Sequence, residues 1–332
     1  MHLVVYLPLA VPLLAAASAR HIASRLPPSV ATWLLAGAAV ALAAGSTAVL
    51  GLLALSAVIQ IPLVAALGDM SLSMVQRHDP ASLSAAIAAG VLLAAVTAAA
   101  TRAAWRRGRA LASAARHARC LPGPGQLVVI PDGAADAYTL PGWPGRIVVT
   151  AGMLDALAPA ERRVLLAHER AHAAGRHYLF TVAAYLAAAA NPLLRPLAAA
   201  VTYTVERWAD ERAAADCGDR ALAARAVARA ALASAERPRS GRHGPARTAA
   251  GTLQSTAGTL RSAALGIAGM AAMRGAGPVP RRVAALLAPP PRFRPLLVAA
   301  IAALVLISGV SVLDAAASLH AFVELAQAHL AS

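Results

Sequence analysis

Four long apolar runs constrain the fold of this 332-residue chain more than any other feature. Each is near the roughly 20 residues that a helix needs to cross a bilayer. The chain as a whole is 59% hydrophobic and only 14% charged, far more apolar than soluble domains usually are. The sequence therefore predicts a mainly α-helical, polytopic membrane protein with about four transmembrane helices, at residues 3–18, 30–56, 82–100 and 296–313.

The distribution of charge predicts how these helices are oriented. Residues 30–68 are long enough for two helices, but a single helix places Arg20, Arg25 and the basic segment after residue 101 on one side, as the positive-inside rule requires. The excess of basic residues is large, since thirty Arg oppose fifteen acids for a net charge of +15. We therefore expect a multi-pass plasma-membrane protein whose region 101–295 is cytoplasmic.

The predicted chain has five parts. They are three N-terminal transmembrane helices in residues 1–100, a cytoplasmic domain in 101–235, an Arg/Gly/Pro-rich linker in 236–295, a C-terminal transmembrane helix in 296–313 and a short tail in 314–332. We expect the linker to be loosely ordered and to lie on the anionic inner leaflet, because Glu236 is its only acid. The lipid bilayer is thus an expected partner. Nucleic acid is not, because the linker has no aromatic residue but Phe293.

The cytoplasmic domain combines short strands with longer helices. Two runs rich in β-branched residues, Leu127–Ile130 and Arg146–Thr150, predict a small hairpin or sheet. A helix is expected from Pro159 to Ala174, with Pro in its first turn. Another is expected at residues 198–216, followed by the helix-ending Gly218.

The first of these helices carries the pattern His168-Glu169-Arg170-Ala171-His172. Residues four apart project from the same helical face, so His168 and His172 can reach one metal ion. Glu169 is rotated by about 100° from His168 and can contact a water on the metal without binding the metal itself. The pattern is that of zinc peptidases. It predicts Zn²⁺ as cofactor and Glu169 as the catalytic base; the alternative is two surface histidines on an amphipathic helix.

A catalytic zinc needs a third protein ligand and one open position. His177 is one candidate, although it falls one residue short of the metzincin spacing. The favoured candidate is Glu206, which lies four residues before Asp210 on one helical face. In that pairing the glutamate binds zinc and the aspartate accepts a hydrogen bond from a ligating histidine. Either acid alone also fits a surface ion pair with Arg207 or Arg212.

The apolar stretch Tyr178–Val201 separates the two halves of this predicted site. If it crossed the bilayer, Glu206 and His172 would lie on opposite sides. The helix from Tyr178 to Asn191 is only about 21 Å long, less than the roughly 30 Å hydrocarbon core, and Pro192 then breaks it. We therefore expect a hairpin that dips into or packs along the membrane.

Several segments resemble a known group of enzymes. LLAHERAH, NPLLRPL and ERWADERAAAD look like the membrane metallopeptidases of the BlaR/MecR antirepressor type, peptidase family M-56, whose relatives are the HtpX-like and CAAX prenyl proteases. The segment AYTLPGWPGRIVVTAGMLDAL is similar to the substrate-side strand and following helix of that family. The resemblance implies a gluzincin-like zinc metalloendopeptidase with ligands His168, His172 and Glu206, base Glu169 and supporting residue Asp210.

The resemblance also implies a protein substrate, either a cytoplasmic transcriptional repressor in a signalling pathway or the chain itself. The alternatives are HtpX-like quality control of membrane proteins and, in another class, a non-catalytic membrane scaffold or sensor. An extended substrate is expected to pair with the strand at Arg146, Ile147, Val148 and Val149. The sequence does not predict the cleavage site, the activating signal or the oligomeric state.

Overall fold

The computed structural model describes residues 7–59, 61, 83–123, 125–142, 145–236 and 278–331. In this part of the chain, four helices are long and apolar enough to cross a membrane. They are α1 (Leu7–Arg25), α2 (Pro28–Ile59), α5 (Leu83–Cys120) and α13 (Pro295–Ala331). The predicted mainly helical fold with four apolar spans is confirmed, and residues 30–56 form one helix rather than two. Which compartment each end faces stays a prediction.

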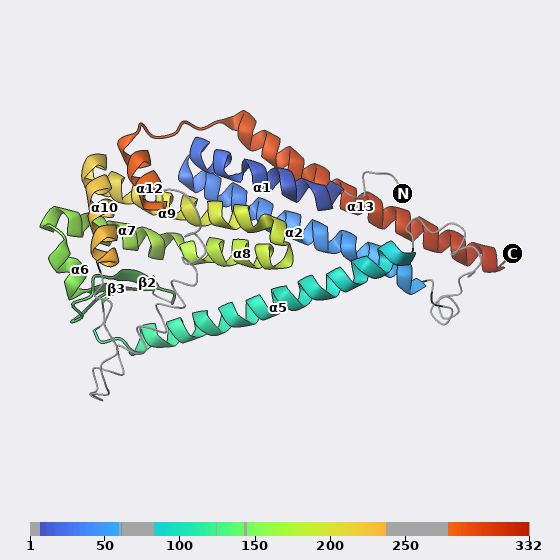
Figure 1. The fold of residues 1–332 in the computed structure, drawn as a ribbon, viewed down its shortest axis with the longest axis horizontal. Coiled ribbons are helices and arrows are strands. Elements are labelled where there is room, and N and C mark those ends of the chain that lie inside the picture. Colours follow the sequence, from blue (N-terminus) through green and yellow to red (C-terminus); the bar gives the residue numbers. More distant parts are fainter. Residues whose placement is uncertain are drawn as a thin grey trace.

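Two of these helices extend beyond their predicted spans. Helix α5 continues past residue 100 to Cys120 and leads directly towards the sheet. Figure 1 shows it running along the bundle from α2 to the strands. Helix α13 continues past residue 313, so the predicted tail is helical as far as Ala331. The helices therefore do not themselves mark where the membrane begins and ends.

The sheet has three strands, β1 (Leu127–Ile130), β2 (Ala137–Leu140) and β3 (Arg146–Thr150), in the order β1-β3-β2. β3 is parallel to β1 and antiparallel to β2. The predicted sheet is thus present, with β2 as an additional strand. Because β3 is central and pairs on both sides, its main chain has no free edge. The predicted pairing of a substrate with Arg146, Ile147, Val148 and Val149 does not fit this sheet. Among the described residues, β2 has no strand partner on its other edge, and α7 packs near this strand.

The remaining helices are α6 (Ala151–Ala156), α7 (Pro159–Gly175), α8 (His177–Ala190), α9 (Arg195–Cys217), α10 (Arg220–Ala235) and α12 (Pro278–Leu287). Figure 1 shows α6, α7, α10 and α12 gathered with the sheet at one end of the bundle. Helix α7 begins as predicted, with Pro159 in its first turn and the Glu161 carboxylate accepting a hydrogen bond from the Ala158 amide at 2.9 Å.

The predicted hairpin at Tyr178–Val201 is present, because α8 and α9 run side by side and are joined by a short 3₁₀ turn, Pro192–Leu194. Asn191 holds this turn. Its side-chain oxygen accepts from the Leu193 amide at 3.1 Å, and its side-chain nitrogen donates to Ser46 of α2 at 3.0 Å. The turn is thus fastened inside the bundle, and α9 returns to the end of the bundle where α7 lies. Contact of the hairpin with lipid stays a prediction.

Helix α12 corrects the prediction of a loosely ordered linker. Residues 237–277 of that linker lie outside the described residues, but residues 278–287 form a helix. Val283 and Leu286 pack into an apolar cluster with Ala223 and Ala224 of α10. The three-residue spacing of Val283 and Leu286 is helical, but the surrounding Arg and Pro residues dominate the composition and hide it.

Candidate metal centre

Three potential metal ligands converge from α7 and α9. His168 and His172 lie one turn apart on α7, with their Nε2 atoms 3.1 Å from each other. Glu206 of α9 brings its Oε2 to 3.7 Å from Nε2 of His168 and its Oε1 to 3.6 Å from Nε2 of His172. Donor atoms of all three residues lie within 4.8 Å of one another. The structure therefore brings together the three residues that the sequence predicted as ligands.

These separations fit a zinc ion. Tetrahedral zinc with bonds of roughly 2.0–2.1 Å keeps its donor atoms about 3.3 Å apart, and the distances between 3.1 and 3.7 Å lie around that value. Two imidazoles and one carboxylate are also a set that leaves the fourth position open for water or substrate. That arrangement is typical of catalytic rather than structural zinc sites.

Asp210 lies behind His168. Its Oδ1 is 3.0 Å from Nδ1 of His168, on the side of the ring away from the metal site, and the residue is only 1% exposed. The ring nitrogen is not well aligned for a linear hydrogen bond to that oxygen. Burial opposes a charge on His168, but Asp210 outweighs this effect and raises the pKa of His168. The position of Asp210 matches the supporting role predicted for it.

His177 lies behind His172. Its Nδ1 is 3.1 Å from Nδ1 of His172, and its ring packs on Trp208 with centroids 4.6 Å apart. His177 therefore faces the far nitrogen of His172, and the three-residue ligand group contains Glu206 in its place. Burial lowers the pKa of His172 to about 3, which keeps the imidazole neutral and its lone pair free for a metal.

Gly175 makes room for His177. The chain turns between α7 and α8 at Arg176, whose φ of 46° is left-handed. A Cβ at position 175 would collide with Nε2 and Cδ2 of the His177 ring. Gly175 thus permits the His177 ring to lie beside the site.

Glu169 is held by the sheet. Its carboxylate is buried, and its Oε2 accepts a hydrogen bond from the hydroxyl of Thr139 on β2 at 2.8 Å. The same hydroxyl lies 3.1 Å from the main-chain oxygen of Glu169. Burial raises the pKa of Glu169, which makes its carboxylate a stronger base. Sequence reasoning had not identified Thr139, because a lone threonine in a short strand gives no indication of its partner.

Arg282 of α12 is the second residue that sequence reasoning missed. Its Nη1 is 2.9 Å from Oε2 of Glu206, and its Nε and Nη2 donate to the two oxygens of Asp210 at 2.7 and 2.6 Å. Burial alone would raise the pKa of both acids, but Arg282 holds the pKa of each below its ordinary value. Glu206 thus pairs with Arg282, and Arg207 instead lies near Glu211.

A small cavity adjoins the side of this centre on which Glu169 lies. It has a volume of about 170 Å³ and reaches His168, Glu169 and Arg282. Most of its wall is apolar and comes from α6, α7 and α10, through Met153, Val164, Leu165, Ala226, Val227, Ala230 and Ala231.

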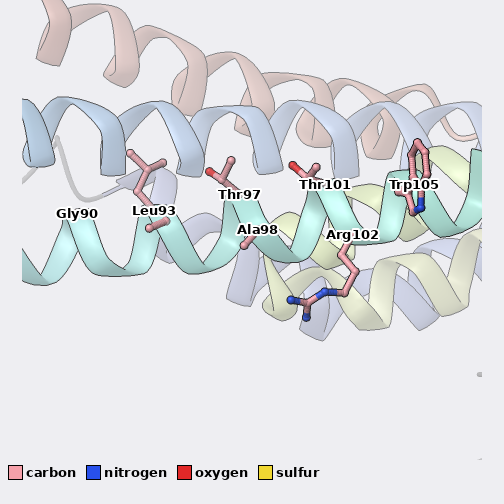
Figure 2. A pocket seen from close by; sticks show the side chains of 8 residues that line it. Gly90, Leu93, Thr97, Ala98, Thr101, Arg102 and Trp105 are labelled. Atoms are coloured by element: carbon pink, nitrogen blue, oxygen red, sulfur yellow. The ribbon is translucent and has the colours of Figure 1, made fainter.

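A larger and more open cavity, of about 780 Å³, lies away from the metal centre along α5. Figure 2 shows Leu93, Thr97, Thr101 and Trp105 at four-residue intervals along one side of that helix. Residues four apart share a helical face, so these side chains form one row. None of the three potential metal ligands lines this cavity.

Three features together define a membrane metallopeptidase. They are two histidines that flank a glutamate on one helix, a pair of acids on a second helix, and four apolar spans. Comparison with known families agrees. A sequence model of peptidase family M48 matches residues 100–289, which is more than half of the chain, and the chain belongs to that family. The family is related to the HtpX and CAAX proteases, and its members depend on zinc.

The match refines the resemblance drawn from the sequence. It is to family M48, on the side of the HtpX-like and CAAX proteases, rather than to family M-56. The matched range begins in α5 and ends just after α12, so it includes the helix that the sequence had assigned to a linker. No curated protein and no solved structure matches the chain significantly.

Proposed function

We propose that this protein is an integral-membrane zinc endopeptidase in which His168, His172 and Glu206 hold the metal. The observation that carries the proposal is the convergence of these three donor groups within 4.8 Å beside the buried carboxylate of Glu169. Bound zinc supplies a Lewis acid that polarises the scissile carbonyl and lowers the pKa of water.

Glu169 acts as the general base and then as the general acid. Its carboxylate accepts a proton from the attacking water as the water oxygen bonds to the carbonyl carbon. When the carbon–nitrogen bond breaks, Glu169 returns the proton to the leaving amine. The Thr139 hydroxyl fixes the orientation of the carboxylate through its 2.8 Å hydrogen bond. Asp210 and His177 restrain the ligating rings from behind.

The substrate is an extended protein segment that adds to the free edge of β2. This edge carries Thr139, so a strand paired there passes close to Glu169. One substrate side chain enters the cavity of about 170 Å³ beside Glu169. Its alanine, valine, leucine and methionine walls favour an aliphatic side chain.

The biological role that we propose is quality control of membrane proteins on the cytoplasmic side of the plasma membrane. Membership of family M48 and four candidate spans support this role over the others. Cleavage of a transcriptional repressor in signalling rests on the M-56 resemblance alone. Induction of the gene by heat or envelope stress would favour quality control, and a repressor gene beside it would favour signalling.

Metal analysis and proteolysis of the full-length protein in detergent test the enzymatic proposal. Wild type should carry near-stoichiometric zinc and hydrolyse an unfolded protein such as β-casein. Glu206→Ala should lose the zinc, whereas Glu169→Gln should keep the zinc and lose about 10²- to 10⁴-fold in rate. Asp216→Asn, an exposed acid on the same helix as Glu206, is the control and should behave like wild type.

Two results would contradict the proposal. One is wild-type protein without zinc, which would favour the scaffold or sensor alternative. The other is a Glu169→Gln protein that hydrolyses casein at the wild-type rate. The sidedness needs its own experiment: a reporter fused after residue 320 should behave as extracytoplasmic, and a cytoplasmic reporter would overturn the proposed orientation.

A further inference from the structure

Arg220, the first residue of α10, holds the C-terminal end of α12. Its Nε donates to the carbonyl of Leu286 at 3.0 Å. Its Nη2 donates to the carbonyls of Ala285 at 3.0 Å and Ala288 at 3.1 Å. The last carbonyls of a helix have no partner within the helix, so this one guanidinium satisfies three acceptors that would otherwise need water or a cap.

The same guanidinium is tied to α9. Nη1 and Nη2 of Arg220 contact the two carboxylate oxygens of Glu211, with Nη2 at 3.1 Å from Oε1. Glu211 directly follows Asp210, the residue bound by Arg282. Glu211 also lies 3.9 Å from Nη2 of Arg207, whose Nη1 donates to a carbonyl of α1 at 3.3 Å. Arg220 therefore fastens α12 to the helix that carries the acidic half of the metal centre.

Helix α12 depends on such contacts for its place. It has only ten residues, and helices shorter than about 12 residues are marginal in water without tertiary packing. Few apolar side chains hold this helix, and they are chiefly Val283 and Leu286, which pack against α10. A run of three prolines, residues 289–291, separates it from α13 and cannot extend the helix.

Arg282 is the reason why the place of α12 matters. Glu206 and Asp210 are two acids one turn apart, and Arg282 lies between them with contacts of 2.6 to 2.9 Å. The planar guanidinium fixes the orientation of both carboxylates, which a point charge on a flexible stem does not do. A shift of α12 would remove these contacts and leave the acid that we propose as a zinc ligand free to rotate.

We propose that Arg220 is a positioning residue of the metal centre, which acts through α12 by keeping Arg282 on Glu206 and Asp210. This inference rests on the proposed function, because it takes Glu206 as a zinc ligand. Arg220 itself does not belong to the ligand group. It sets zinc affinity at a distance, by docking a helix rather than by contacting the metal.

A double-mutant cycle on zinc affinity tests this inference in the full-length protein in detergent. Arg282→Ala should weaken zinc binding by about 10- to 100-fold, the usual effect of losing a partner behind a metal ligand. Arg220→Ala should weaken it by about tenfold or more. If Arg220 acts through Arg282, the double variant should bind zinc no worse than Arg282→Ala alone. Arg220→Lys should recover little, because lysine cannot reach several carbonyls and Glu211 together.

Arg229→Ala is the matched control. Arg229 lies on the same helix and forms an ion pair at 2.8 Å, but with Glu161 of α7. Its loss should leave zinc affinity unchanged. Hydrogen exchange adds a readout that does not depend on zinc: peptides from residues 278–288 should exchange faster in Arg220→Ala, while those from α7 and α9 should exchange as in wild type.

The inference would be overturned by wild-type zinc affinity in Arg220→Ala, or by losses that add fully in the double variant. Unchanged exchange of α12 in Arg220→Ala would overturn it as well. Wild-type protein that binds no zinc would instead refute the proposed function. The exchange experiment would then still decide whether Arg220 holds α12.

Discussion

Helices α7 and α9 place their functional groups by spacing along a helix, whereas α10 and α12 place theirs by packing against other elements. His168 and His172 share a face because they are four residues apart, and the same is true of Glu206 and Asp210. Arg282 reaches Asp210 across 72 residues of sequence, and only because α12 is docked on α9 and α10. The first pair of helices supplies the proposed metal ligands, and the second supplies contacts to their side chains.

This difference predicts different sensitivities. Substitution of a proposed metal ligand in α7 or α9 removes a donor atom outright. A substitution in α10 or α12 leaves every donor in place and changes only its orientation or the shape of the cavity beside Glu169. Zinc affinity should therefore fall most for the first pair of helices, less for Arg282, and not at all for the cavity wall.

The largest effect is expected for His172→Ala. Zinc sites bind with about 10–16 kcal/mol, so each of a few ligands contributes roughly 3 kcal/mol and its loss should weaken binding by about two orders of magnitude or more. Competition with a zinc chelator measures the change. His320→Ala, which removes an exposed histidine on α13, should bind zinc as wild type does. If a His172→Ala variant kept wild-type zinc affinity, His172 would not be a zinc ligand, and the contrast between α7 and the helices α10 and α12 would fail.

A smaller loss is expected for Arg282→Ala than for His172→Ala. Because all three donor groups remain, we expect zinc to bind about 10- to 100-fold more weakly. The neighbouring Arg281 stacks on Tyr203 at 4.3 Å and provides the control, since Arg281→Ala removes the same charge without touching either acid. If the two variants lose zinc equally, net charge and not orientation is responsible, and the distinction between the two pairs of helices breaks down.

The same distinction explains what the sequence predicts. The motif on α7 and the Glu206–Asp210 pair depend on local helical spacing, so both are visible in one sequence. The single helix α2 was predictable from the placement of Arg20 and Arg25. These features depend on the order of residues along one element and on a bilayer of known thickness.

The remaining features depend on tertiary contacts that one sequence does not encode visibly. Arg282 lies in a stretch whose composition resembles a linker, and nothing near it indicates two acids on a distant helix. Strand order is a second example. The β-branched run Arg146–Thr150 indicates a buried strand, but only the pairing partners show that it is central and that β2 lies at one edge of the sheet. Thr139, which holds Glu169, lies on that edge strand.

The cavity wall should affect substrate choice and leave the metal unchanged. Ala230→Leu places three more carbons in the cavity of about 170 Å³ beside Glu169. We expect cleavage at sites with a large aliphatic residue to fall by about tenfold, the low end for one misfitted methylene in an apolar pocket. Mapping the cleavage sites in β-casein measures this shift, with zinc content as the second readout.

Ala221→Leu is the control for the cavity, because Ala221 is an exposed residue of the same helix. It should leave both the cleavage sites and the zinc content unchanged. If Ala230→Leu shifts no cleavage site, the cavity does not hold a substrate side chain. If Ala230→Leu lowers zinc affinity, the cavity wall affects the metal centre as well as the choice of substrate, contrary to the prediction.

The smallest effect is expected where β2 meets α7. Thr139→Val removes the hydroxyl that donates to Glu169 at 2.8 Å and keeps the shape of the side chain. A hydrogen bond of this kind contributes about 1 kcal/mol net, so kcat should fall about fivefold while KM and zinc content stay unchanged. Thr181→Val, which removes only a local hydroxyl contact within α8, should have no such effect. A rise in KM with unchanged kcat would mean that Thr139 contacts the bound substrate strand instead of orienting the base. The sheet would then contribute to substrate binding, as the cavity wall does, and not to the orientation of Glu169.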